Sequence, residues 1–329
     1  MKKRKLINKI AAAGLSSLLI ASGLYHQQKK EMFSGKFITG LFFHNPSKYH
    51  FERCINWLKE NNCVFISTEQ LIDILGGKDE VKSGMVWITF DDGWQKNLTE
   101  VVPILTKYTI PATFFISTGP VEGKGLFWFS LVRRFSNILP PPFRNNVKKL
   151  WQIDENERKE IVHNLEQELT SKQFSFEHNR EAMTIVDIKQ LSQNHLITFG
   201  SHTVNHVITP NCTEEQIRSE ISKSKLKLEL WTGQKVYCYS HPNGDFDGRE
   251  RKILVELGFK LAATTQKEFI DPSSNLNLLQ IPRFCVNDDS FFPEALCQIV
   301  GIWGRSMDKI KRKRRSISII KIKNPKGRR

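Results

Sequence analysis

The chain of 329 residues has no C-x-x-C pair, no internal repeat and no apolar run as long as the ~20 residues of a membrane-spanning helix. Its six cysteines are widely spaced, so we expect most of them to be buried, unpaired thiols that form no site. The composition is also not that of a disordered chain, since 40% of the residues are hydrophobic and they include 22 Phe and 7 Trp. Such a chain can bury a substantial core without cross-links.

Charge is balanced in the middle of the chain and unbalanced at its ends. The formal net charge of +15 comes from a cluster within residues 2–9 and a second within residues 305–329. The net positive charge therefore belongs to the two ends of the chain and not to the domain between them. We expect the basic tail, residues 301–329, either to be solvated or to contact a membrane lipid or an anionic cell-wall polymer. No nucleic acid is expected as a partner, because the N-terminus indicates export.

Basic residues at the N-terminus precede a stretch of sixteen uncharged positions, Ile10–Tyr25. This layout is typical of a signal peptide, and the small residues Ala21, Ser22 and Gly23 offer a cleavage site. An uncleaved membrane anchor is the alternative. We predict that residues 1–27 are a signal peptide or a membrane anchor, and that the protein is extracytoplasmic, either secreted or anchored.

Strands and helices alternate along the rest of the chain. Apolar runs predict strands at 36–44, 86–90, 112–116, 196–199, 236–239, 259–264 and 279–284. Helical patterns lie at 50–60, from Ser67 onward, and at 99–108, 213–231 and 249–257. This alternation predicts an α/β fold with a largely parallel sheet or barrel. Residues 121–185 interrupt it with three consecutive prolines and a charged helix near 151–171, so we predict one domain over 28–300 with this insertion on its rim.

Two clusters of polar residues follow predicted strands. Asp91 and Asp92 come directly after the strand at 86–90, and His202 and His206 follow the strand at 196–199. Catalytic groups of such folds usually lie at the carboxyl ends of the strands. Alone, Asp-Asp-Gly is good turn chemistry, and two histidines four residues apart are frequent by chance; at that spacing they share one face of a helical turn.

Together the two clusters offer one carboxylate and two imidazoles to a metal ion, with a second carboxylate left as a base. This donor set suits Zn²⁺ and leaves open positions for water and substrate. It also accepts Co²⁺, Ni²⁺ or Fe²⁺. The sequence therefore indicates a divalent metal site whose ion we expect to be zinc.

The pair of motifs TFDDG (89–93) and HTVNH (202–206) resembles those of the NodB-type polysaccharide deacetylases, carbohydrate esterase family 4. PATFFIS at 111–117 and GFKLAATT at 258–265 extend the resemblance, which covers the chain from about His44 to Asp288. It implies a distorted (β/α) barrel. It also implies a metal-dependent hydrolase that removes N-acetyl groups from an N-acetylglucosamine-containing polysaccharide.

The resemblance assigns roles to residues of this chain. Asp91 would be the general base and Asp92 the metal-binding carboxylate, with His202 and His206 as the two imidazole ligands. The metal would polarise water and the acetyl carbonyl, and a general acid would protonate the departing amine.

The chain departs from the family at its third motif, usually Arg-x-Pro-Tyr. Here the segment is Ser240-His241-Pro242-Asn243-Gly244, which retains the proline and the turn but has no arginine. Asn243 can still lend its backbone N–H to an oxyanion beside Pro242. Arg283, at the end of the strand at 279–284, is either the missing guanidinium or a surface arginine.

The family's catalytic-acid histidine near the C-terminus is also missing, because no histidine follows His241. Some deacetylases of exopolysaccharide systems have a rearranged barrel with a histidine after an N-terminal strand, and Leu41–Asn45 resembles that arrangement. We therefore predict His44 as the general acid, with His241 in reserve. Among the aromatic residues, Trp94 and Trp128 are the candidates for contact with a sugar.

Other functions remain open at the level of sequence. The same metal site could act on a non-sugar amide, or the altered third motif could mark a non-catalytic carbohydrate-binding protein. Retention of both Asp91 and Asp92 favours an enzyme, because a degenerate site has no use for the base.

Overall fold

The computed structural model describes residues 6–303, and within this range eight strands form one sheet in which every strand pairing is parallel. The strands are β1 (Thr39–Phe43), β2 (Val64–Ile66), β3 (Met85–Phe90), β4 (Ala112–Ile116), β5 (Ile197–Ser201), β6 (Cys238–Ser240), β7 (Leu261–Ala263) and β8 (Phe284–Cys285). They lie in the order β7-β6-β5-β4-β3-β1-β8, with β2 beside β3. The predicted α/β fold with a parallel sheet is confirmed.

The sheet curls because one late segment touches both of its edges. Ile281 pairs with Ala263 at the end of β7, and three residues later Phe284 pairs with Leu41 of β1. The strand predicted over 279–284 is thus wrong in extent, since Pro282 lacks an N–H and the chain changes partners there. The result is the distorted barrel, with an inner cluster of apolar side chains that includes Trp87 and Phe115.

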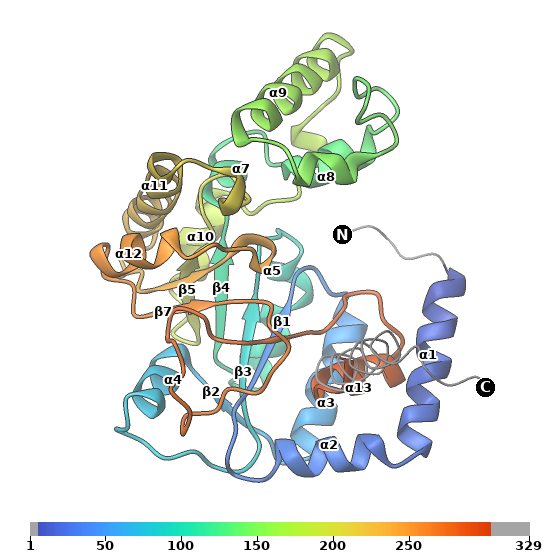
Figure 1. Ribbon diagram of the computed structural model, residues 1–329, viewed down its shortest axis with the longest axis vertical. Helices are drawn as coiled ribbons and strands as arrows, with labels where there is room; N and C mark the ends of the chain where they lie inside the picture. The colour runs from blue at the N-terminus through green and yellow to red at the C-terminus, as the bar shows by residue number, and fades with distance from the viewer. Residues whose placement is uncertain (1–5, 304–329) are drawn as a thin grey trace, which may run out of the picture.

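Helices cover the outside of the curled sheet (Figure 1). They are α3 (Lys48–Glu60), α4 (Thr68–Leu75), α5 (Asn97–Glu100), α6 (Val102–Lys107), α10 (Ile185–Leu191), α11 (Glu214–Thr232), α12 (Arg249–Glu256) and α13 (Phe292–Ile299). Their apolar faces and the outward side chains of the strands form the largest hydrophobic cluster. The helix predicted over 99–108 is broken at Val101, because Pro103 cannot donate a backbone hydrogen bond and begins a new helix instead.

The N-terminal helices lie against this domain. α1 (Leu6–Ala21) runs beside α13, where Trp303 Nε1 donates to Ser16 Oγ at 3.2 Å and Lys9 pairs with Asp289 at 3.0 Å. α2 (Leu24–Met32) follows and buries Met32. Among the described helices none alone has the length and apolar character of a membrane span; α1 and α2 meet that test only together, and they are bent by 78°. The predicted basic tail, apart from residues 301–303, lies outside the described residues.

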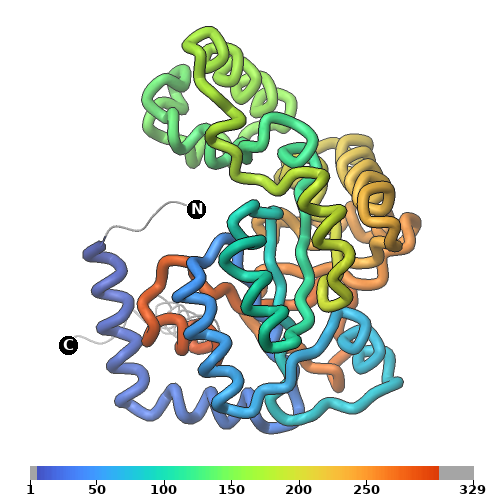
Figure 2. The backbone as a smooth tube through the Cα atoms, turned by 180° about the vertical axis from the view of Figure 1, so that it is seen from behind, coloured from blue at the N-terminus to red at the C-terminus, as the bar shows by residue number. Residues whose placement is uncertain are grey.

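The insertion forms a helical unit at one end of the molecule, as the green segment shows in both views (Figures 1 and 2). It contains α7 (Thr118–Glu122), α8 (Trp128–Arg134), the 3-10 turn η1 (Val147–Trp151), α9 (Glu155–Ser171) and the 3-10 turn η2 (Glu177–Asn179). Its side chains form a hydrophobic cluster of their own, whose buried members include Leu131, Phe143 and Leu165. The insertion is therefore internally packed and stands on the rim of the barrel.

The six cysteines are all unpaired thiols, four of them buried and two half-buried. The prediction of isolated thiols is confirmed.

Candidate metal centre and active site

The residues singled out by the two motifs meet at the carboxyl ends of the strands. His44 follows β1, Asp91 and Asp92 follow β3, and His202 and His206 follow β5. All five line one cavity of 80 Å³. Because the strands are parallel, their carboxyl ends open on the same side of the barrel, which is why residues far apart in the chain converge there.

Asp92, His202 and His206 present one ligand atom each to a common point. The three atoms lie within 4.8 Å of one another, and all three side chains are buried. Asp92 Oδ1 is 3.5 Å from His202 Nε2 and 3.3 Å from His206 Nε2. One carboxylate and two imidazoles that converge in this way are a donor set for a divalent cation.

The hydrogen bonds around these side chains leave their inward atoms free for a cation. His202 Nδ1 bonds to the carbonyl of Ser240 at 2.8 Å, which leaves Nε2 as the ligand atom. Asp92 Oδ1 is buried without a hydrogen-bond partner. Burial lowers the pKa of His206 and favours the neutral imidazole, the form that ligates a metal. The residues present therefore fit a divalent metal, and their chemistry admits zinc, cobalt, nickel or iron.

Trp94 holds the metal-binding carboxylate from behind. Its Nε1 donates to Asp92 Oδ2 at 2.9 Å, and its ring packs on Phe127 and Phe129. Only 7% of Trp94 is exposed. The prediction that Trp94 contacts a sugar is wrong, because the ring is enclosed by the insertion and does not line the cavity; it orients Asp92 instead.

The two histidines meet across a turn and not along a helix, contrary to the spacing argument. Thr203 and His206 have φ values of 65° and 50°, in the left-handed region. The imidazole rings nevertheless lie edge to face with centroids 4.8 Å apart. Asp92 is also left-handed, with φ of 77°. Backbone strain of this kind clusters at functional sites, where the surrounding structure must hold it in place.

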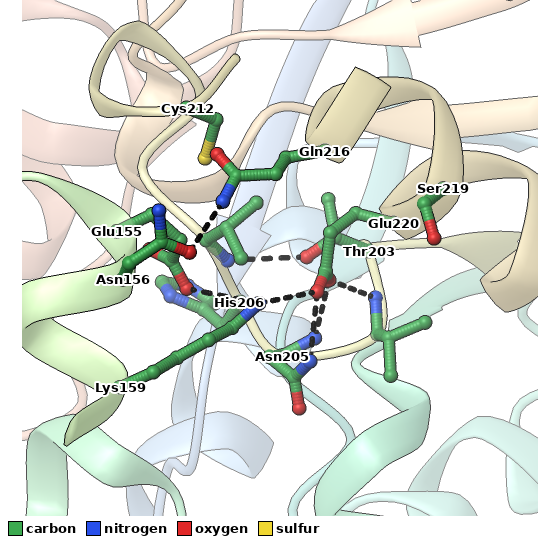
Figure 3. Close-up of polar contacts among 12 residues, drawn as sticks. Glu155, Asn156, Lys159, Thr203, Asn205, His206, Cys212, Gln216, Ser219 and Glu220 are labelled. Atoms are coloured by element: carbon green, nitrogen blue, oxygen red, sulfur yellow. Dashed lines mark hydrogen bonds and ion pairs between the residues drawn. The ribbon is translucent and has the colours of Figure 1, made fainter. Parts of the chain in front are cut away.

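Glu220 on α11 holds the turn between the two histidines (Figure 3). Its Oε2 accepts hydrogen bonds from the backbone N–H groups of Val204 at 3.0 Å and Asn205 at 2.8 Å. Its Oε1 accepts from Asn205 Nδ2 at 2.7 Å and lies 3.5 Å from Lys159 Nζ of α9. The opposite side of the turn is closed by Gly119, where a Cβ would lie 2.6 Å from Asn205 Oδ1. Sequence gives no signal for Glu220, because its role depends on the packing of α11.

The insertion contacts the same turn from the rim. Trp128 Nε1 donates to the carbonyl of His206 at 3.1 Å, and the Arg158 guanidinium lies 4.1 Å above the Trp128 ring. Trp128 was predicted as a residue with access to a sugar. Trp128 is half-buried and does not line the catalytic cavity, so its contact with a sugar stays a prediction beside its observed contact with this turn.

Arg283 reaches Asp91 from the segment that joins the two edges of the sheet. Its guanidinium is fully buried and donates two parallel hydrogen bonds, Nη1 to Oδ1 and Nη2 to Oδ2, both 2.8 Å long. Gly40 leaves room for it, since a Cβ there would be 3.2 Å from Arg283 Cγ. Of the two alternatives for Arg283, the surface arginine is excluded, and the guanidinium missing after β6 is supplied from residue 283.

The electrostatics of Asp91 suit a base. Burial raises the pKa of Asp91, but the Arg283 guanidinium and the His202 imidazole lower it by more, so the net shift is downward. The carboxylate is therefore ionised at neutral pH. Ser240 Oγ, which accepts from Arg283 Nη2 at 2.9 Å, lies 3.4 Å from Asp91 Oδ2.

The two candidates for the general acid lie in different places. His44 lines the cavity with Asp91 and Asp92, and its Nδ1 is buried without a partner. His241 does not line that cavity, and its Nε2 hydrogen-bonds to the carbonyl of Leu279 at 3.2 Å. Burial lowers the pKa of His241 to about 4, so the ring is uncharged at neutral pH. The geometry favours His44.

The loop after β6 keeps the turn that the third motif requires. Pro242 is buried and begins the 3-10 turn η4 (Pro242–Gly244), while Asn243, with φ of 56°, lines the cavity. Five further cavity residues were not predicted: Phe42 of β1, Thr265 after β7, and Phe129, Arg133 and Trp151 of the insertion. The sequence carries no signal for the three that come from the insertion.

Residues 78–262, more than half of the chain, match the family model described as polysaccharide deacetylase. The chain is also similar to the poly-beta-1,6-N-acetyl-D-glucosamine N-deacetylase of Staphylococcus aureus. The two are 26% identical over 277 residues, which are 81% of this chain and 78% of the relative.

Solved structures share the fold. A Streptococcus pyogenes deacetylase, PplD, in complex with acetate has a TM-score of 0.56 and 20% identity, and the match covers 80% of this chain and 98% of that one. IcaB from Ammonifex degensii has a TM-score of 0.56 and 18% identity, with 80% and 96% of the two chains covered.

Proposed function

Because this chain belongs to the polysaccharide deacetylase family and is therefore a hydrolase, we propose that it removes acetyl groups from the N-acetylglucosamine residues of a polymer with the help of a divalent metal. The relatives of similar length support this substrate class. They make the β-1,6-linked polymer the first one to test.

The observation that carries the proposal is the pair of carboxylates with separate partners. Asp92 faces two imidazoles, and Asp91 faces a guanidinium. A binding protein that had lost its activity would need neither the buried Asp91–Arg283 pair nor the buried, unpartnered Oδ1 of Asp92, each of which costs stability.

In this mechanism Asp92, His202 and His206 would hold the cation, which would supply Lewis-acid polarisation to water and to the acetyl carbonyl. Asp91 accepts a proton as the water oxygen bonds to the carbonyl carbon, and Arg283 keeps the carboxylate in place. The backbone N–H of Asn243 donates to the developing oxyanion.

His44 then gives a proton to the nitrogen as the C–N bond breaks, releasing acetate and a free amine. Each proton-transfer group of this kind contributes about 10²–10⁴-fold in rate.

We also propose that the enzyme acts outside the cytoplasm, secreted or held at the membrane by residues 1–27. The support is the basic and then uncharged N-terminal sequence. The basic tail would contact lipid or an anionic cell-wall polymer. Fractionation of cells that express the full chain, with and without residues 305–329, tests both parts.

The first experiment measures acetate release by the full chain from N-acetylglucosamine hexamers in β-1,6 and β-1,4 linkage and from peptidoglycan. Each reaction is run with added Zn²⁺ and with a chelator. We expect acetate from at least one sugar polymer and its loss with the chelator. Bound metal without acetate from any sugar would instead indicate a different amide substrate.

A further inference from the structure

A second, larger cavity opens beside the catalytic cavity and is formed by the insertion; we call it the insertion cleft. It has a volume of 1080 Å³, whereas the catalytic cavity has 80 Å³. Typical ligand sites measure about 300–1,000 Å³, so the catalytic cavity is too small for a polymer and the insertion cleft is not. Arg133 and Trp151 line both cavities and form the boundary between them.

Arg133 has unused hydrogen-bonding capacity at this boundary. Its guanidinium lies between two aromatic rings, 5.6 Å from the centroid of Phe129 and 5.0 Å from that of Trp151. Among residues 6–303 no carboxylate forms an ion pair with it, although the Asp92 carboxylate attracts its charge from a greater distance and partly offsets the effect of burial on its pKa. A guanidinium carries five N–H donors, and sugar hydroxyl and acetyl oxygens are acceptors for them. The half-buried Trp151 ring offers an apolar surface of the kind against which a sugar ring packs.

The insertion cleft carries an excess of positive charge. Three cations, Arg133, Arg134 and Lys148, line it with a single carboxylate, Glu181. The reaction turns a neutral acetamide into an amine that is protonated at neutral pH. A deacetylated residue in the cleft would therefore add a fourth cation beside the first three, whereas an acetylated residue adds none.

We propose that the insertion cleft binds the N-acetylated sugar residues that neighbour the one being deacetylated, and that it disfavours residues with a free amine. The inference rests on the proposed function, since it assigns the binding site for the rest of the same polymer. It follows that deacetylation slows next to sites already deacetylated, so the acetyl groups removed are spaced along the chain.

The first test changes the space in the cleft. Ser136 lines the cleft, and its exposed neighbour Asn137 does not, so Ser136→Trp and Asn137→Trp are matched variants. For the wild type we expect kcat/KM to be at least 10-fold higher on the hexamer than on N-acetylglucosamine itself. Ser136→Trp removes most of this difference without lowering the rate on the single sugar, and Asn137→Trp preserves it. Equal rates on the two substrates in the wild type, or a hexamer rate that Ser136→Trp leaves unchanged, would overturn the proposal.

The second test changes the charge of the cleft. Lys148 lines it, whereas Lys149, in the same 3-10 turn and also exposed, does not. We expect the wild type to be about 3- to 10-fold slower on a hexamer with glucosamine beside the reactive residue than on the fully acetylated hexamer. Lys148→Glu should reduce the difference in rate between the two hexamers, and Lys149→Glu should leave it unchanged. A wild type that treats both hexamers alike contradicts the charge argument.

A binding measurement separates failure of this inference from failure of the proposed function. Calorimetric titration of the fully acetylated hexamer into Asp91→Asn protein, with and without Ser136→Trp, needs no turnover. Weaker binding in the Ser136→Trp protein supports the cleft even where no acetate is released. Equal binding by the two proteins refutes it, whatever the wild type hydrolyses.

Discussion

Asp91 and Asp92 are adjacent in the chain, yet their carboxylates have different partners. The left-handed backbone at Asp92 turns its Oδ1 toward two imidazoles, while Asp91 stays on the path of β3 and faces Arg283. This geometry supports the proposed division of metal binding and proton transfer between two neighbouring residues. A substitution at one of them should leave the role of the other intact.

Asp91→Asn tests this division. The amide cannot accept a proton from water, so we expect kcat to fall by about 10²–10⁴-fold. Metal content, measured by mass spectrometry of the purified protein, should stay at the wild-type level because the ligands are untouched. His202→Ala is the contrasting variant and should lose metal and activity together. Turnover near the wild-type rate in Asp91→Asn would remove Asp91 from the role of base.

His44→Ala should lower kcat by about 10²-fold or more with unchanged metal content, because it removes the proton donor for the amine. An acetate ester of a good leaving group does not need that proton. It should therefore be hydrolysed by His44→Ala at nearly the wild-type rate. His241→Gln is the control and should retain full activity on both substrates. If His241→Gln loses the activity instead, the acid has been assigned to the wrong histidine.

His241 should also make stability depend on pH. Burial holds its pKa at about 4 in the folded protein, against 6.5 in the unfolded chain. Between these values the unfolded chain binds a proton that the native state does not, so stability falls as the pH drops from 6.5 to 4. The contribution amounts to about 3 kcal/mol. Urea unfolding of metal-free His241→Gln at pH 7 and pH 4.5 should show a smaller pH dependence than the wild type, and an equal dependence would contradict this account.

Among the elements, α11 has the closest connection to the chemistry. Its Glu220 accepts hydrogen bonds from two backbone N–H groups of the turn between His202 and His206. The same carboxylate forms an ion pair with Lys159 of α9, in the insertion. The turn contains left-handed residues that need such support. The geometry of the metal site therefore depends on a helix that contributes no ligand.

Glu220→Gln keeps the shape of the side chain but removes its charge and one acceptor, so the Asn205 amide and Lys159 lose their partner. We expect metal affinity to fall by about 10-fold or more, the usual effect of removing support for ligands. Activity at saturating metal should largely return. Glu215→Gln, at an exposed site of the same helix, is the matched control. Equal metal affinities of Glu220→Gln and this control would show that α11 does not position the proposed ligands.

Sequence predicted the parts of this structure that depend on local patterns. The alternating strands and helices, the start of α4 near Ser67 and the two motifs with the proposed ligands follow from residues within a few positions of one another. It failed where long-range packing decides. In sequence, Trp94 is a candidate for stacking on a sugar, and only the folded structure shows that Phe127 and Phe129 enclose its ring. Glu220 is one glutamate among several on α11. The sequence leaves open whether Arg283 is the missing guanidinium or a surface arginine, because nothing in residues 279–284 shows that this segment closes the barrel beside Asp91.

At the scale of the whole molecule, a metal held by Asp92, His202 and His206 would join segments that follow two different strands, so its binding should stabilise the fold. At a free zinc concentration 100-fold above Kd, the gain in the free energy of unfolding is about 2.7 kcal/mol for a single site. Calorimetric scans should show a rise in Tm with zinc that the chelator reverses. His202→Ala should show no rise. An equal rise in that variant would place the zinc elsewhere, for example on the free cysteines.

The pairing of Asp91 with Arg283 spans 192 residues of chain. During synthesis at about 5–20 residues per second, Arg283 is added to the chain roughly 10–40 s after Asp91. A nascent chain that ends before residue 283 has both metal-binding motifs but holds Asp91 without its cationic partner, and its barrel is still open between β7 and β1. The proposed catalytic base therefore gains its partner from nearly the last segment of the domain to emerge from the ribosome, so we expect an unfinished chain to be inactive.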